Sequence, residues 1–218
     1  MIGITTYSLK APVTLRVALV ADLHNHPQAE VLQAVKEIKP DIIAVAGDFY
    51  HDQYQIFLNA MTEIAPTFVS LGNHETVYRN EIIDTVSNTK AVLLDNKQIN
   101  FRDTGIYIGG MSSEYNLKWL ERFSAMKGYK ILLCHHPEYY KRFVKGKDID
   151  LILAGHAHGG QIRLFGKGLF APGQGLFPKY TSGVYDGRLL VSRGIANMVK
   201  IPRLFNKGEV ICIELKKE

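Results

Sequence analysis

Five short apolar runs in this chain each end directly in residues whose side chains bind metal ions. The runs are residues 15–20, 42–46, 68–71, 131–134 and 151–154. Continuous apolar runs of four to six residues are typical of strands that are covered on both faces, as in parallel sheets. Because ligands of open α/β sheets bind beyond the carboxyl ends of the strands, we expect the five run ends to converge on one place.

Aspartate and histidine dominate the run ends. The candidate ligands, in chain order, are Asp22, His24, Asp48, Asn73, His135, His156 and His158. Residues two apart in an extended segment point the same way, which sends Asp22 with His24, and His156 with His158, toward a common centre. All eight histidines lie on or within about four residues of the run ends, and residues 159–218 contain none. A purely structural use of histidine would scatter them.

The composition of this set predicts the kind of metal site. Seven donors are too many for one tetrahedral zinc ion and suit two cations that share a bridging carboxylate. Imidazole, carboxylate and amide donors together favour Mn²⁺, Fe²⁺, Zn²⁺ or Co²⁺ over sites built from thiolate or from oxygen alone. Two such cations can bind the attacking and leaving oxygens of an in-line displacement and activate a bridging water. This chemistry is that of phosphoester hydrolysis.

Amphipathic segments alternate with the apolar runs. Residues 28–38, 53–64, 79–87 and 116–126 carry apolar residues three and four positions apart, which predicts helices. Strand and helix in alternation predict a largely parallel sheet. Hairpins are expected at residues 98–109 and, across Asp186 and Gly187, at residues 184–192, with a last strand at residues 210–215. We therefore expect an α/β fold of two mixed sheets flanked by helices, in one domain spanning residues 1–218.

The motifs at the run ends, taken in order, resemble those of the calcineurin-like metallophosphoesterases. They are DLH at residues 22–24, GD at 47–48, GNHE at 72–75, a histidine two places before Pro137, and GHAH at 155–158. The longer stretch GHAHGGQIRL and the segment 191–194 further resemble a bacterial branch of predicted phosphohydrolases and UDP-2,3-diacylglucosamine pyrophosphatase-like enzymes. The resemblance implies a four-layer α/β/β/α sandwich.

The resemblance also implies a role for each residue. Asp22, His24, Asp48 and His158 would hold one metal ion, and Asp48, Asn73, His135 and His156 the other, with Asp48 as the bridge. A metal-bridging hydroxide would attack phosphorus in line, and His74 would protonate the leaving oxygen as general acid. Glu75 either orients His74 or caps the following helix, and the sequence leaves both alternatives open.

The leading functional hypothesis is a binuclear metal-dependent hydrolase of a phosphodiester, a pyrophosphate or a phosphomonoester, on a small or lipid-linked substrate. The alternatives are a protein phosphatase and a non-catalytic scaffold of the same fold that binds a protein partner. Nucleic acid is not expected as a partner, because no extended basic groove with interleaved aromatic residues is evident. His26 and His51 follow the motifs closely and are expected to be partly exposed neighbours without a catalytic role.

Composition bears on where the protein works. The two cysteines cannot form a disulfide framework, and the first 20 residues lack the apolar core of a signal peptide or membrane span, which favours the cytoplasm. The net charge of +5 favours anionic partners. Residues 164–180 are rich in glycine and aromatic residues, so this loop either packs on its own domain or contacts an acyl chain or membrane surface. The sequence does not predict the oligomeric state.

Overall fold

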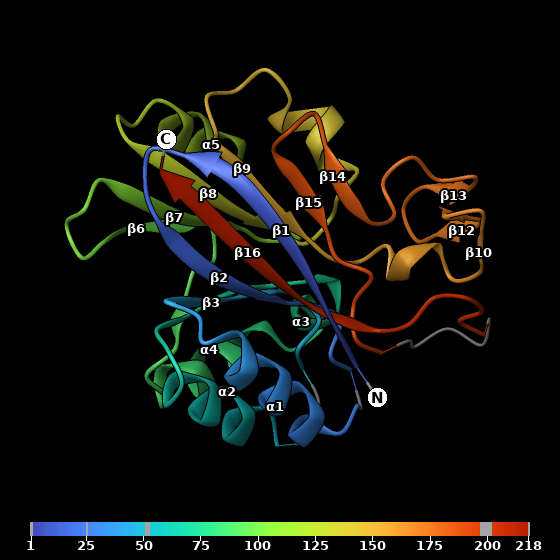
Figure 1. Cartoon of the computed structure of the whole chain (residues 1–218). Helices are drawn as coiled ribbons and strands as arrows, with labels where there is room; N and C mark the ends of the chain where they lie inside the picture. Colours follow the sequence, from blue (N-terminus) through green and yellow to red (C-terminus); the bar gives the residue numbers. More distant parts are fainter. Residues whose placement is uncertain (1, 25, 51–52, 197–201, 218) are drawn as a thin grey trace.

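The computed structural model describes residues 2–24, 26–50, 53–196 and 202–217 as two six-stranded sheets packed face to face. Figure 1 shows the sheets crossing the centre of the molecule, with helices outside each. The first sheet has the strand order β1-β16-β2-β3-β4-β5. Its strands are β1 (Gly3–Ala11), β16 (Glu209–Lys217), β2 (Leu15–Val20), β3 (Ile42–Ala46), β4 (Thr67–Ser70) and β5 (Val92–Leu93).

The second sheet has the strand order β14-β15-β9-β8-β7-β6. Its strands are β14 (Gly183–Tyr185), β15 (Leu189–Val191), β9 (Leu151–Ala154), β8 (Tyr129–Cys134), β7 (Ile106–Met111) and β6 (Lys97–Phe101). Each sheet is mixed: β2, β3 and β4 run parallel, whereas β16 pairs antiparallel with β2, and β6 and β14 form antiparallel edges of the second sheet. The carboxyl ends of the parallel strands therefore lie together at one end of the sheets.

Helices cover the outer face of each sheet. The first sheet is covered by α1 (Gln28–Ile38), α2 (Tyr54–Thr62), α3 (Asn73–Val77) and α4 (Arg79–Ser87), and the second by α5 (Leu117–Ser124) and the π-helix η1 (Tyr140–Val144). The predicted four-layer α/β/β/α sandwich of two mixed sheets is therefore confirmed. Three apolar cores separate the layers, one of them between the two sheets.

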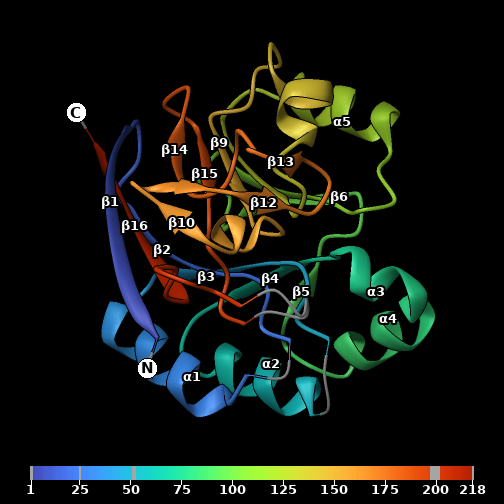
Figure 2. The ribbon, with the colours of Figure 1, turned by 90° about the vertical axis from the view of Figure 1, so that its right-hand side faces the viewer.

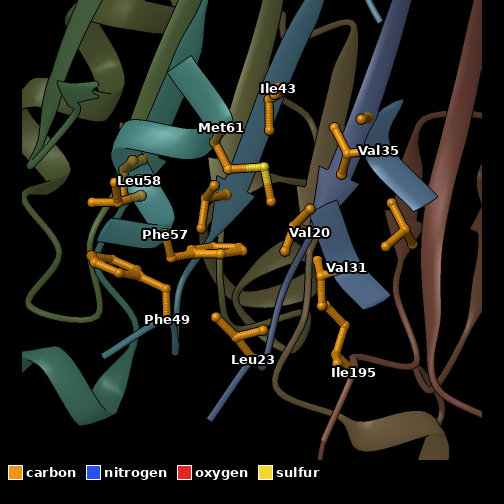
Figure 3. Close-up of a cluster of buried hydrophobic side chains, with 14 of the residues drawn as sticks. Val20, Leu23, Val31, Val35, Ile43, Phe49, Phe57, Leu58, Met61 and Ile195 are labelled. Atoms are coloured by element: carbon orange, nitrogen blue, oxygen red, sulfur yellow. The ribbon is translucent and has the colours of Figure 1, made fainter. Parts of the chain in front are cut away.

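The core beneath α1 and α2 shows why the predicted helices form. The apolar face of α1 buries Val31 and Val35, and that of α2 buries Phe57 and Met61, all against β2 and β3 (Figure 3). Full burial of each such side chain is worth about 1.5–3 kcal/mol, which fixes the helices on the sheet. The helices cover the outer face of the sheet, and the loops that follow β2, β3 and β4 lie uncovered at the carboxyl ends of these strands.

Two strands of the first sheet, β1 and β5, were not predicted. The strand β1 alternates half-buried and exposed residues and pairs in parallel with β16, more than 200 residues away in the chain. Its alternating burial identifies an edge strand with one face in contact with the core. The predicted strands were continuous apolar runs or parts of hairpins, and β1 shows neither pattern.

A pair of short hairpins follows β9 and projects from the side of the sandwich (Figures 1 and 2). The 3₁₀-helix η2 (His158–Gly160) leads into β10 (Arg163–Leu164) and β11 (Lys167–Gly168), and then into β12 (Phe170–Ala171) and β13 (Gly175–Leu176). We call residues 162–182 the double hairpin. Among the described residues, no helix has the length and apolar character that a membrane span requires.

Candidate active site

The predicted ligands lie where the strands end, as expected from the parallel topology. Asp22 and His24 follow β2, Asp48 follows β3, Asn73 begins α3 after β4, and the remaining three histidines follow β8 and β9. Both sheets therefore contribute residues to one cluster, and its members are as far apart in the chain as Asp22 and His158. Possible ligand atoms of Asp22, His24 and His158 lie within 4.8 Å of one another, and so do those of Asp48, His135 and His156.

The carboxylate of Asp48 lies at the centre of the cluster. Its Oδ2 atom is 3.2 Å from Nε2 of His135, 3.8 Å from Nε2 of His74 and 3.9 Å from Nε2 of His24. Its other oxygen, Oδ1, accepts the backbone N–H of His74 at 3.2 Å. One oxygen is thus held by the backbone, and the other faces three imidazoles from different elements.

The second carboxylate, Asp22, is held in a similar way. Both of its oxygens accept the backbone N–H of His156, at 3.0 and 3.1 Å, and Oδ1 lies 3.9 Å from Nε2 of His158. The rings of His24 and His158 stack with their centroids 5.4 Å apart. The first strand end and the last are therefore joined directly at the site.

Backbone carbonyls orient two of the imidazoles. Nδ1 of His135 lies 2.8 Å from the carbonyl oxygen of Ala46, and Nδ1 of His158 lies 3.1 Å from that of Ala196. Each carbonyl selects the tautomer that carries its proton on Nδ1, which leaves the Nε2 lone pair facing the cluster. Metal-binding histidines are typically oriented by such hydrogen bonds.

Three atoms of the predicted ligands are buried without a hydrogen-bond partner among the described residues. They are Nε2 of His24, Nε2 of His135 and Oδ1 of Asn73. A buried polar atom without a partner is unfavourable, and it calls for an ion or water that satisfies it. All three are good donors to a divalent cation of intermediate softness, so the residues present fit a metal site.

Burial and mutual charge shift the pKa values in the cluster strongly. Burial lowers the pKa of His24 to about 4 and, with help from His135 and His136, that of His156 to about 2. Burial also acts to lower the pKa of His135, but the Asp48 carboxylate outweighs it and raises that pKa to about 10. Burial opposes ionisation of Asp48, yet the surrounding histidines hold its pKa well below its usual range. His24 and His156 are thus neutral, as metal binding requires, whereas His135 would release the proton that Asp48 stabilises when a cation binds.

The backbone at the site is unusual. Asp22, His24, Asp48, His156 and His158 all have φ between 45° and 64°, a left-handed conformation that few non-glycine residues adopt. Such conformations cost of order 1–3 kcal/mol each and cluster at functional sites. Glycines allow the close approach that this geometry needs: a Cβ on Gly72 would collide with Asp48, and one on Gly194 would collide with Asp22. The requirement for Gly194 was not apparent from the sequence.

Glu75 caps the helix that carries His74. Its Oε2 atom accepts the backbone N–H groups of Gly72, at 2.7 Å, and Asp48, at 2.8 Å, while Oε1 accepts that of Tyr50 at 2.8 Å. Burial, followed by the charge of Asp48, raises the pKa of Glu75 to about 7. Of the two alternatives that the sequence left open, the structure confirms capping, and Glu75 also ties α3 to the Asp48 loop.

The other candidate residues are placed as follows. The side chain of His74 is 41% exposed, at the open side of the cluster. His26 is partly exposed, as expected, with Nε2 at 4.0 Å from Glu30, whereas His51 lies outside the described residues. His136, to which the sequence analysis gave no role, hydrogen-bonds Ser113 at 2.8 Å, and its ring centroid lies 4.3 Å from that of His156.

Fold and site together define a metal-dependent phosphoesterase. The family model of the calcineurin-like phosphoesterases matches residues 15–160, and the chain belongs to this family. It is therefore a metal-dependent phosphohydrolase, as the motifs predicted.

Several relatives show how far the likeness extends. Phosphodiesterase YaeI of Escherichia coli is 27% identical over 92% of this chain and 82% of its own length. Uncharacterized metallophosphoesterase Cj0846 of Campylobacter jejuni is 28% identical over 95% of this chain and 59% of its own length. The bovine transmembrane protein with metallophosphoesterase domain is 26% identical over 68% of this chain, which covers 41% of that protein. The chain thus spans only part of some longer relatives.

Proposed function

We propose that this protein is a phosphodiesterase that acts through two divalent cations. Asp22, His24, Asp48 and His158 would hold one cation, and Asp48, Asn73, His135 and His156 the other. The observation that carries the proposal is the position of Asp48 Oδ2, which lies 3.9 Å from Nε2 of His24, in the first ligand set, and 3.2 Å from Nε2 of His135, in the second. A carboxylate oxygen shared by both halves of the ligand set is what a bridge between two cations requires.

Bound cations would supply a nucleophile from water at neutral pH and stabilise the charge that develops on the phosphoryl oxygens. The chain's own contribution is to hold the ligands rigidly. Carbonyl oxygens fix the rings of His135 and His158, and backbone N–H groups fix the carboxylates of Asp22 and Asp48. Geometry fixed in this way does not have to be organised again during the reaction.

His74 is proposed to donate a proton to the leaving oxygen. Its ring is partly exposed at the open side of the cluster, 3.8 Å from Asp48 Oδ2 and with its centroid 5.0 Å from that of His24. A side chain at this place can contact a bound phosphoester. The four histidines proposed as ligands are buried, so His74 is the imidazole best placed to exchange a proton with a substrate.

The name of the Escherichia coli relative supports a diester substrate over a monoester. The competing interpretation, a non-catalytic scaffold, predicts metal binding without turnover. The phosphodiesterase and scaffold interpretations can be tested on one preparation of the protein. Its metal content is measured, and its hydrolysis of bis-p-nitrophenyl phosphate, a diester, is compared with that of p-nitrophenyl phosphate, a monoester. We expect two equivalents of metal per chain after loading with Mn²⁺ and faster turnover of the diester.

The matched variants are Asp48→Asn and Asp84→Asn, since Asp84 is an exposed aspartate on α4. Asp48→Asn should lower bound metal and reduce turnover on the order of 10³-fold or more, whereas Asp84→Asn should leave both unchanged. Double occupancy without hydrolysis in the wild type would favour the scaffold. A single equivalent of metal would contradict the bridging role of Asp48.

A further inference from the structure

Exposed apolar side chains gather on the double hairpin and the loop beside it. Of the 14 large apolar side chains exposed in the described part of the chain, six lie here: Leu164, Phe165, Leu176, Phe177, Leu204 and Phe205. Phe165, Phe205 and Phe177 are the three most exposed of all, at 103%, 81% and 80%. We call these six residues the apolar tips. Isolated exposed apolar residues are ordinary, but a cluster of this kind marks a surface for interaction.

The segments that carry the tips lie side by side, because hydrogen bonds join them. The N–H of Arg163 donates to the carbonyl of Leu204 at 3.0 Å, and that of Phe177 donates to the carbonyl of Leu169 at 2.9 Å. An open hollow of about 680 Å³ lies between the β10–β11 hairpin and residues 177–185, and its lining includes Phe165, Lys167 and Phe177. Phe165 and Phe177 therefore border the hollow, and the double hairpin that carries them lies on the side of the sandwich that faces the viewer in Figure 2.

The three phenylalanines share an uncommon backbone conformation. Phe165, Phe177 and Phe205 have φ of 49°, 51° and 54°, a conformation that bulky side chains rarely adopt. Other described residues do not cover the three rings, as their exposed fractions show. At Phe165 the two-residue turn between β10 and β11 accounts for the positive φ, so it is the exposure of the rings that indicates a partner.

Basic side chains outnumber acidic ones around the tips. Residues 159–208 contain eight lysines and arginines and a single acidic residue, Asp186. Lys167, Lys179 and Lys207 are exposed, whereas Asp186 is already paired with Lys145 at 3.0 Å. The other carboxylates that face this region are Glu138, next to Gly173, and Glu209, which is paired with Arg193. The surface therefore complements an anionic partner.

The surface is linked directly to the candidate active site. The helix η2, which contains His158, continues within three residues into β10. Next to Phe205, the side-chain amide of Asn206 donates to the carbonyl oxygens of His158, at 2.7 Å, and Gln161, at 2.9 Å. Arg203 donates to the carbonyl of Ala196 at 3.0 Å, the same carbonyl that faces Nδ1 of His158. A partner bound at the tips would lie next to the metal ligands.

We propose that the apolar tips dock the protein on an anionic lipid bilayer. The aromatic and leucine side chains would enter the boundary between headgroups and acyl chains, and Lys167 and Lys179 would lie at the lipid phosphates. Separate projecting tips with lysines between them suit a soft bilayer surface, whereas a protein partner would need a matching pocket for each tip. This inference does not depend on the phosphodiesterase proposal, because docking requires no turnover.

Co-sedimentation with vesicles tests the proposal on the whole chain. We expect wild-type protein to bind vesicles that contain phosphatidylglycerol more tightly than vesicles of phosphatidylcholine alone. The double variant Phe165→Ser/Phe177→Ser should bind at least about tenfold more weakly. The control variant Ile56→Ser removes a side chain that is 61% exposed on α2, away from the tips, and should bind as the wild type does.

The lysines are tested separately. Lys167→Gln/Lys179→Gln should weaken binding to anionic vesicles by about fivefold for each lysine, and the difference should disappear at high salt. Absence of wild-type binding to either vesicle, or an equal loss in Ile56→Ser, would overturn the proposal. A dimer that Phe165→Ser/Phe177→Ser dissociates, without any vesicle binding, would assign the tips to a second copy instead. An unchanged melting temperature shows that each variant is folded. Vesicle binding can be measured whether or not the protein hydrolyses a diester, so a failure of one proposal is distinguishable from a failure of the other.

Discussion

The candidate active site and the apolar tips depart from the usual distribution of side chains in opposite directions. At the site, polar atoms of His24, His135 and Asn73 are buried without a partner among the described residues. At the tips, phenyl rings are exposed that elsewhere in the chain are covered. Since either departure is unfavourable for the isolated chain, each indicates a ligand that the chain itself does not supply.

The two regions differ in how firmly they are held. Site residues follow core strands and are fixed by backbone hydrogen bonds to both carboxylates and two imidazoles. The double hairpin rests on two ladders of two residue pairs each. A cation pair needs fixed geometry, whereas a lipid surface adapts to its partner. Changes at the site should therefore affect catalysis strongly, and changes at the tips should leave it intact.

The largest contrast is expected from His74→Ala. If His74 protonates the leaving oxygen, hydrolysis of an alkyl phosphodiester should slow by about 10²–10⁴-fold, while a p-nitrophenyl diester, with a good leaving group, should be affected far less. Steady-state kinetics on the two substrates measures the difference. Equal losses on both would remove His74 from the role of general acid.

A smaller effect is expected from Glu75→Gln. The amide replaces one of the two oxygens that together accept three backbone N–H groups, so the Asp48 loop and α3 lose part of their connection. Metal affinity should fall by about 10–100-fold, as for other groups that orient metal ligands. Calorimetric titration with Mn²⁺ measures the affinity, and Glu81→Gln, on the exposed face of α4, is the control. Unchanged affinity would limit Glu75 to a cap.

Metal removal should lower the stability of the protein. Binding to the folded state alone, at a free metal concentration 100 times the dissociation constant, adds about 2.7 kcal/mol. For a chain of this size that corresponds to a shift in Tm of roughly 5–10 °C between chelated and Mn²⁺-loaded protein, measured by calorimetry. A Tm that does not respond to metal would mean that the buried Nε2 atoms are satisfied in another way.

The smallest effects on catalysis are expected at the tips. Phe165→Ser/Phe177→Ser removes only exposed rings, so turnover of a soluble diester should stay within about twofold of the wild type and stability within about 0.5 kcal/mol. Turnover of the diester and the melting temperature are measured for the double variant and the wild type. A large loss of turnover in solution would show that the double hairpin supports the site and is not an independent surface.

Much of the fold could be predicted from local patterns. Helix α1 has the predicted bounds, because its apolar spacing matches the helical period, and β3 has them because its five residues are continuously apolar. The hairpin at Asp186 and Gly187 forms where positive φ was expected. The strand β1 was missed, because an edge strand has a weaker pattern and its pairing with β16 is remote in the sequence.

The sequence by itself identified the chemistry that the site can carry, since Asp22, Asp48, Asn73 and the histidines are recognisable as candidate metal ligands by type and by position after apolar runs. Only the tertiary structure decided which atom of each residue faces the cluster, because that depends on carbonyls such as Ala46 and Ala196, which come from distant segments. It also decided that Phe165, Phe177 and Phe205 lie in water. An aromatic residue in a glycine-rich loop can be buried or exposed, and the choice depends on whether the rest of the chain offers a surface to cover it.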